Sequence, residues 1–122
     1  MRKLAPYLAA AAVVLFAFAA RAGAPPKKTP EILKEGKASY EMNCAACHGD
    51  AGKGDGPAGA ALDPKPRDLV KGAFKKGTQA AQVFDTLTKG LDGTTMISFG
   101  HLSEQERWAL TYYTLELRGA KK

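Results

Sequence analysis

The chain has 122 residues, of which 45% are hydrophobic and 25% charged, a length and composition that fit one globular domain. Its formal charge is +6, but three of its 18 basic residues lie within the first 22 positions. The remainder therefore has 15 basic against 12 acidic residues, a net charge of +3. A balance this small argues against nucleic acid as a partner, because nucleic-acid-binding domains need a concentrated basic face.

Residues 1–22 have the pattern of a secretory signal peptide. Arg2 and Lys3 form a basic start, an apolar run rich in alanine covers 4–20, and the small residues around Ala22 suit a cleavage site. The alternative is an uncleaved membrane anchor, since about 17 apolar residues is the lower limit for a spanning helix. We predict export to the periplasm with cleavage after Ala22, and keep a membrane-anchored form open.

A leader, a domain and a short tail are predicted to follow. Residues 23–29 are rich in proline and have no periodic apolar pattern, which is typical of a flexible leader. The folded domain is expected at 30–119, and 120–122 form a basic tail. Thr29 caps the first predicted helix, which runs from Pro30 to about Ala46.

The first helix carries an apolar stripe that contains a glycine. The stripe consists of Leu33, Gly36, Tyr40 and Cys44, spaced three to four residues apart. A glycine inside a helix costs stability unless another helix must approach closely at that point. Gly36 is therefore a position where a neighbouring helix could come close.

The segment N-C-A-A-C-H-G at 43–49 contains the spacing C-x-x-C-H. Cys44 and Cys47 are three residues apart and lie on one face of a helix, where each thiol can bond a different vinyl group of one porphyrin. His48 follows at once and reaches the iron as proximal ligand. The spacing therefore predicts one covalently attached haem c.

Two other readings of the same residues are weaker. A redox-active C-x-x-C belongs near a β-α-β pattern, which the surrounding sequence lacks. A zinc site could recruit His101 as a fourth ligand, but adjacent Cys47 and His48 are poorly placed around one tetrahedral ion. A covalent haem is distinguished from both because it survives denaturation and adds its mass to the polypeptide.

Residues 50–77 are predicted to be loop. Gly54, Gly56 and Gly59 match G-x-G-x-x-G, but no strand precedes them, so we interpret the match as coincidence. The glycines instead allow positive φ and a close approach of backbone to the porphyrin. Arg67 either binds a haem propionate or is a solvated surface residue. A basic cluster is formed by Lys53, Lys65, Lys71, Lys75 and Lys76.

Two further helices are predicted in the C-terminal half. Thr78 caps a helix that runs through Lys89, with Val83, Phe84 and Leu87 buried and Gly90 as its stop. The segment 91–100 is a loop containing Met96. A capping box at Ser103 and Glu106 begins the last helix, which continues to about Arg118 and carries aromatic residues that we assign to the core.

The order of these motifs resembles the class I c-type cytochrome family. The shared features are G-x-x-x-Y, C-x-x-C-H-G, a glycine-rich loop with Gly56-Pro57, G-T-x-M at 93–96 and an aromatic C-terminal helix, and they span 30–118. The resemblance implies an all-α fold in which the N- and C-terminal helices cross near Gly36 and Tyr40. A third helix and Gly/Pro-rich loops then wrap round the covalent haem.

The resemblance also implies ligand roles. It suggests that the carbonyl of Pro57 binds the second ring nitrogen of His48, and that Met96 is the sixth iron ligand. Met42 and His101 are the other candidates. Met42 is tied to the proximal side by its place beside Cys44, whereas Met96 lies in a loop where the backbone can bend freely.

With one haem and a methionine ligand, the chain is expected to be an electron carrier and not an enzyme, because a saturated iron offers no position for substrate. The alternative is a haem enzyme or gas sensor with an open sixth position. The lysine cluster suggests redox partner proteins with acidic docking surfaces. A free shuttle and a subunit serving a membrane respiratory complex or periplasmic dehydrogenase are both left open.

Overall fold

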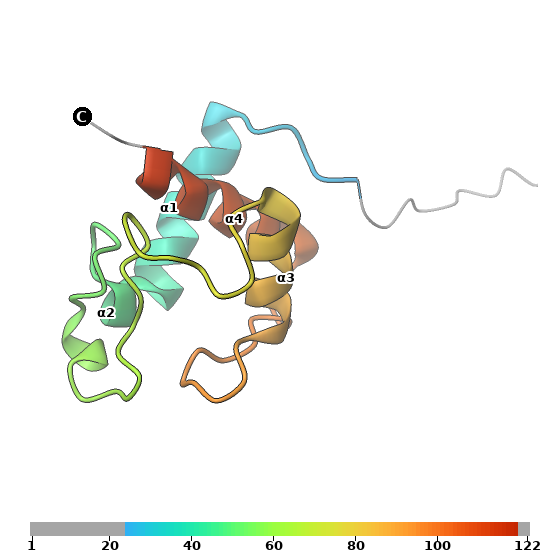
Figure 1. The fold of residues 1–122 in the computed structure, drawn as a ribbon. Helices are drawn as coiled ribbons and strands as arrows, with labels where there is room; N and C mark the ends of the chain where they lie inside the picture. The colour runs from blue at the N-terminus through green and yellow to red at the C-terminus, as the bar shows by residue number, and fades with distance from the viewer. Residues whose placement is uncertain (1–23, 120–122) are drawn as a thin grey trace, which may run out of the picture.

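The computed structural model describes residues 24–119, and these are helical without strands (Figure 1). The elements are α1 (Pro30–Asn43), α2 (Ala45–His48), the 3-10 turn η1 (Pro57–Gly59), α3 (Ala80–Lys89) and α4 (Glu104–Gly119). The all-α prediction is confirmed. The predicted signal peptide at 1–22 and the tail at 120–122 lie outside the described residues.

Helices α1 and α4 cross and pack against each other (Figure 1). Gly36 is buried at the crossing, where a Cβ added to it would lie 2.1 Å from the carbonyl oxygen of Ala109. The ring of Tyr40, one turn further along α1, lies 5.3 Å from that of Tyr113 on α4. The prediction that Gly36 marks a helix crossing is therefore confirmed.

The first helix is shorter than predicted. Thr29 caps it as expected, accepting a hydrogen bond from the Ile32 amide at 3.3 Å, but it ends at Asn43 and not near Ala46. Cys44 leaves the helical region with φ −123° and ψ −37°, and a separate short helix, α2, begins after it. The rest of the haem-attachment motif, residues 45–48, thus forms its own helical turn, and Cys44 separates this turn from α1.

Helix α3 begins one residue later than predicted. Gln79, not Thr78, is the N-cap, and it exchanges capping-box hydrogen bonds with Gln82. Val83 and Leu87 are buried as predicted, and Gly90 ends the helix with φ 74°. The predicted capping box of α4 is present. The Ser103 amide donates to the Glu106 carboxylate at 3.0 Å, and the Glu106 amide donates to the Ser103 hydroxyl at 3.2 Å.

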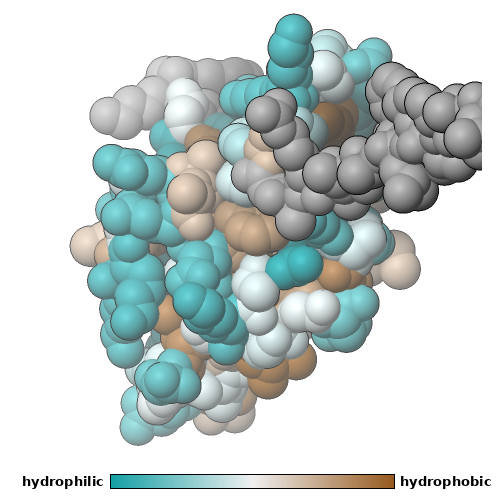
Figure 2. All heavy atoms as spheres, turned by 90° about the vertical axis from the view of Figure 1, so that its right-hand side faces the viewer, coloured by the Kyte–Doolittle hydropathy of each residue, from teal (hydrophilic) through white to brown (hydrophobic). Residues whose placement is uncertain are grey.

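The leader before α1 contacts α4 at two points, although the sequence predicts a free tether. The carbonyl of Pro26 accepts a hydrogen bond of 2.6 Å from the Tyr112 hydroxyl, and Lys28 pairs with Glu116. Figure 2 shows that hydrophilic side chains gather toward the left of the face that it views, and that hydrophobic side chains appear there as small patches. Within residues 24–119, no helix combines the length and the apolar character needed to cross a bilayer.

Candidate haem-binding site

A cavity of about 520 Å³ lies among the helices and loops, and its lining includes Cys44, Cys47, His48 and Met96. In the ribbon, the segment around α2 and the loop after α3 flank this part of the molecule from opposite sides (Figure 1). Buried or half-buried apolar side chains complete the lining, among them Leu69, Phe74, Val83, Leu87 and Phe99. The fold thus brings the predicted attachment and ligand residues to one apolar space.

Both cysteines are free thiols on this cavity. Burial, with a smaller contribution from nearby Cys47, raises the pKa of the Cys44 thiol to about 12. A thiol active in disulfide exchange has a lowered pKa, because the thiolate is the nucleophile. The redox-dithiol reading therefore does not fit. Among the described residues, no group of three or more His, Cys, Asp or Glu side chains is arranged to hold a metal ion.

His48 is held in the form that suits an iron ligand. Its Nδ1 atom lies 3.0 Å from the carbonyl oxygen of Arg67, so Nδ1 carries the proton and Nε2 keeps its lone pair. Burial lowers the pKa of the imidazole, although the hydrogen bond to Arg67 acts in the opposite direction. The ring is therefore favoured in the neutral state that metals bind.

The carbonyl partner of His48 differs from the predicted one. Pro57 was expected to supply it, but the structure gives this position to Arg67, which lies 19 residues after His48. Pro57 is exposed at the start of η1 and is absent from the cavity lining. The Arg67 side chain lines the cavity and donates to the carbonyl of Ala73, and its contact with a propionate stays a prediction.

The glycine-rich loop packs behind the attachment motif. The amide of Gly54 donates to the carbonyl of His48 at 2.8 Å, and that of Gly56 to Cys47 at 3.1 Å. A Cβ on Gly56 would lie 2.4 Å from the oxygen of Ala46. At Gly56 the close approach is therefore to the backbone of α2, and the approach of these glycines to the porphyrin stays a prediction.

Tyr40 supports the motif from the other direction. Its buried hydroxyl donates to the carbonyl of Gly49 at 2.7 Å, and burial raises the pKa of this phenol. Gly49 directly follows His48, so the hydrogen bond ties the end of α2 to α1. Sequence analysis placed Tyr40 in the core but missed this contact, because it depends on how the chain turns after His48.

Met96, the candidate for the sixth iron ligand, is half-buried. It packs against the core cluster, and its amide donates to the Thr94 hydroxyl at 3.1 Å while its carbonyl accepts from the Leu91 amide at 3.0 Å. His101 and Met42 also line the cavity, but both are exposed, Met42 by 83%. The burial of Met96 separates it from its two competitors.

The chemistry of these residues fits haem c. Two thiols three residues apart, a neutral imidazole with a free Nε2 and a thioether share one apolar cavity. Thioether bonds need the thiols, and haem iron accepts nitrogen and sulfur ligands. The residues therefore define a site for a covalently bound haem.

Comparisons with known proteins agree with this site. A family model described as Cytochrome c matches residues 33–118. The chain is 33% identical over 99 residues to the Cbb3-type cytochrome c oxidase subunit FixP of Azorhizobium caulinodans, covering 81% of this chain and 31% of that protein. It is 32% identical to the CcoP subunit of Azospirillum brasilense over 72% of this chain and 29% of that one. The chain belongs to the cytochrome c family, and its cofactor is covalently attached haem c.

A solved structure shows the same fold. The reducing HAO-like protein complex Kustc0457/Kustc0458 of Kuenenia stuttgartiensis contains a chain that superposes with a TM-score of 0.72 and 39% sequence identity. The match covers 78% of this chain and 47% of that one. The protein described here spans about a third of the length of its curated relatives.

Proposed function

We propose that this protein carries single electrons between redox partner proteins, with His48 and Met96 as the two axial ligands of its haem. The observation that carries the proposal is the half-buried Met96 on the same apolar cavity as His48 and both thiols. When bound, the haem iron supplies the redox chemistry by alternating between the ferrous and ferric states. A methionine in the sixth position leaves no open site for a substrate, which favours a carrier over an enzyme.

Each part of the chain has a task in this proposal. Cys44 and Cys47 keep the cofactor attached, and the Arg67 carbonyl holds the His48 ring in the tautomer that presents Nε2. The buried apolar side chains of the lining, such as Val83, Leu87 and Phe99, would shield part of the haem from water. A dry, fixed environment keeps the ligands in place in both oxidation states, so little rearrangement accompanies each electron transfer.

The mouth of the cavity suits a transient protein partner. Ile97 is 63% exposed and borders the cavity together with Met42. Lys65, Lys75 and Lys76 also lie along its lining, whereas Lys53 and Lys71 do not. Apolar side chains beside lysines favour a small interface with an acidic partner. The named relatives are oxidase subunits and part of an HAO-like complex, which supports a membrane respiratory complex or a periplasmic dehydrogenase as the partner.

Export to the periplasm is part of the proposal. Attachment of haem to two free thiols in an oxidising compartment agrees with the signal-peptide pattern of residues 1–22. We expect the purified haem protein to begin at Gly23. Its intact mass measures this directly: the mass of residues 23–122 plus one haem supports cleavage, and the mass of the full chain plus haem would show a retained anchor.

The Met96→Ala variant tests the ligand assignment. We expect it to lose the weak far-red charge-transfer band of ferric iron bound to methionine sulfur, to have a lower reduction potential and to bind carbon monoxide when reduced. His101→Ala is the matched control, because His101 lines the same cavity but is exposed, and it should change none of these. If the band survives in Met96→Ala, another sulfur such as that of Met42, which also lines the cavity, binds the iron. If the reduced wild type already binds carbon monoxide readily, an open-site haem enzyme or gas sensor becomes the better reading.

A further inference from the structure

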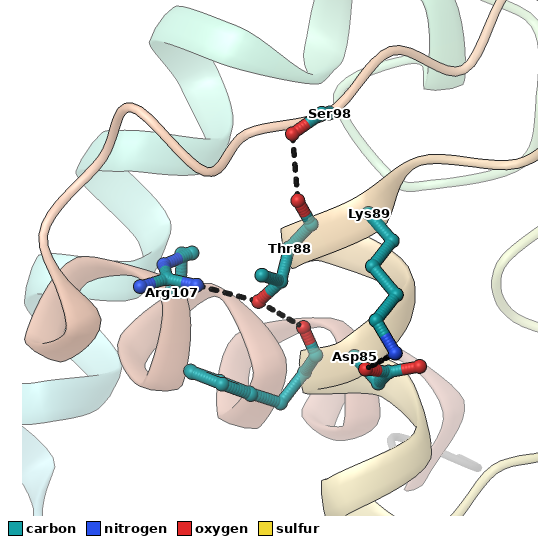
Figure 3. A network of polar contacts seen from close by, with 6 residues as sticks. Asp85, Thr88, Lys89, Ser98 and Arg107 are labelled. Carbon is teal, nitrogen blue, oxygen red and sulfur yellow. Dashed lines mark hydrogen bonds and ion pairs between the residues drawn. The ribbon is translucent and has the colours of Figure 1, made fainter. Parts of the chain in front are cut away.

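The loop that carries Met96 is fastened to the C-terminal end of α3. The last carbonyls of a helix have no partner within the helix and must be satisfied from outside. Here the Leu87 carbonyl accepts from the Phe99 amide at 2.8 Å, and the Thr88 carbonyl accepts from the Ser98 hydroxyl at 2.6 Å (Figure 3). Ser98 and Phe99, which follow Met96 by two and three positions, thus supply hydrogen-bond donors to the last carbonyls of α3.

Arg107 of α4 extends this contact to a second helix. Its Nη1 donates to the Thr88 hydroxyl at 2.6 Å, and that hydroxyl donates in turn to the Phe84 carbonyl at 2.8 Å (Figure 3). The guanidinium also lies 5.0 Å from the centre of the Phe84 ring. A cation near the C-terminus of a helix is favourable because of the helix dipole. Arg107 therefore stabilises the end of α3 to which the loop is attached.

The backbone is closely packed where the end of α3 meets the Met96 loop. A Cβ on Gly90 would lie 2.7 Å from the Met96 carbonyl oxygen and 2.8 Å from the Ser98 nitrogen. The remaining hydrogen bonds of Met96 are local, to Leu91 and Thr94 within the same loop. The contacts with Leu87 and Thr88 are therefore the hydrogen bonds that join this loop to α3, and they act beside the packing of the buried Phe99 side chain in the core.

We propose that Arg107, Thr88 and Ser98 form a positioning clamp that holds Met96 on the distal side of the haem. None of these three residues lines the cavity, so their effect passes through the loop and not through contact with the cofactor. The clamp sets how often the loop opens and the sixth position becomes accessible. The inference rests on the proposed ligation by Met96.

The test uses the haem-loaded protein and two readouts, the rate of carbon monoxide binding to the reduced form and hydrogen exchange of the Phe99 amide. Ser98→Ala removes the loop contact from an exposed position, so the fold should persist. Thr88→Val removes the hydroxyl that Arg107 binds, and Thr88→Ser restores it. Losing one hydrogen bond should increase the open population about fivefold, raising both rates by that factor.

Asp85→Asn is the matched control. Asp85 lies on the same helix and pairs with Lys89 at 2.7 Å, a contact that does not reach the loop (Figure 3). Both rates should equal those of the wild type. Combining Ser98→Ala with Arg107→Gln should have less effect than the product of the single changes, because both break one clamp.

Three results would overturn the proposal. The first is carbon monoxide binding at the wild-type rate in both Ser98→Ala and Thr88→Val. The second is faster Phe99 exchange with unchanged carbon monoxide binding, because the contacts would then hold the loop without holding the ligand. The third is a charge-transfer band that survives in Met96→Ala. That result would refute the ligand assignment itself, and it can be told apart from the first two because it is measured in a variant of Met96 and not of the clamp.

Discussion

The two sides of the haem cavity are built in different ways. On the proximal side, Cys44, Cys47 and His48 lie within five consecutive residues, and one helical turn gives them their relative positions. On the distal side, the Met96 loop depends on Thr88 and, through it, on Arg107, which is 19 residues from Thr88 in the sequence. The relative positions of the two thiols and His48 are therefore encoded by local spacing, although the carbonyl that orients the His48 ring comes from Arg67, 19 residues away. The position of the Met96 loop relative to the helices depends on tertiary contacts.

This difference has a consequence for robustness. Covalent attachment of the haem and a short helix keep His48, the proposed proximal ligand, in place even when distant contacts weaken. The loop of Met96, the proposed distal ligand, is kept in place by several hydrogen bonds of modest individual strength, each worth about 1 kcal/mol. We therefore expect distant substitutions to change the distal side first, and local substitutions in the attachment motif to have the largest effects.

The largest effect is expected from the Cys44→Ser, Cys47→Ser double variant. It leaves no thioether, and a cavity of about 520 Å³ with apolar walls would then lack its covalent filling. A small domain rich in loops has little other core, so we expect most of its helical circular dichroism to disappear. Cys44→Ser alone should give an intermediate haem yield. Normal folding of the double variant without haem would show that the proximal motif does not organise the fold.

The scaffold that carries the proximal motif is tested by Gly36→Val. The new side chain would meet the backbone of Ala109 and the Cβ of Tyr113 at distances of 2.1 to 2.9 Å, so α4 must move. We expect a loss of about 1–3 kcal/mol in the free energy of unfolding by denaturant. Gly119→Ala is the control, since nothing lies within 4 Å of its added Cβ. Equal stability of the two variants would contradict a tight crossing.

Charge at the cavity mouth should have a smaller, salt-dependent effect. Replacing Lys75 and Lys76 with Glu should slow oxidation of the reduced protein by anionic ferricyanide roughly tenfold at low salt, because electrostatic attraction is lost. The difference should fade at high salt. The control replaces Lys27 and Lys34 with Glu. Both lysines are exposed and lie outside the cavity lining, so the net charge changes by the same amount at a different place. Equal slowing in both pairs would mean that net charge, not position, matters.

The smallest effect concerns the start of α4, beside the distal loop. Hydrogen bonds from the Ser103 amide and hydroxyl lower the pKa of the Glu106 carboxyl below its ordinary value of 4.5. A lowered folded-state pKa contributes stability above pH 4.5 that is lost as the pH falls through the folded-state value. The melting temperature of the wild type should therefore exceed that of Glu106→Gln near neutral pH, and the gap should narrow in acid. A gap that widens in acid would contradict this sign.

The sequence by itself determined the elements whose information is local. The spacing of Cys44, Cys47 and His48 predicted the cofactor, which family membership confirms. The capping box at Ser103 and the glycine at position 36 predicted a helix start and a helix crossing, and both are present. The cofactor and the helix start could be predicted because each depends on residues within about one helical turn, whereas the partner of Gly36 at the crossing, Ala109 of α4, is distant in the sequence and was implied by the family resemblance.

Only the tertiary structure decided which distant groups meet. Sequence analysis assigned the carbonyl beside His48 to Pro57, but the path of the loop brings Arg67 there instead. It also missed Thr88 and Ser98, because a hydrogen bond between a hydroxyl and the end of a helix leaves no periodic pattern. Backbone carbonyls are identical in every residue, so their partners are chosen by the path of the chain, which is fixed when the apolar side chains pack.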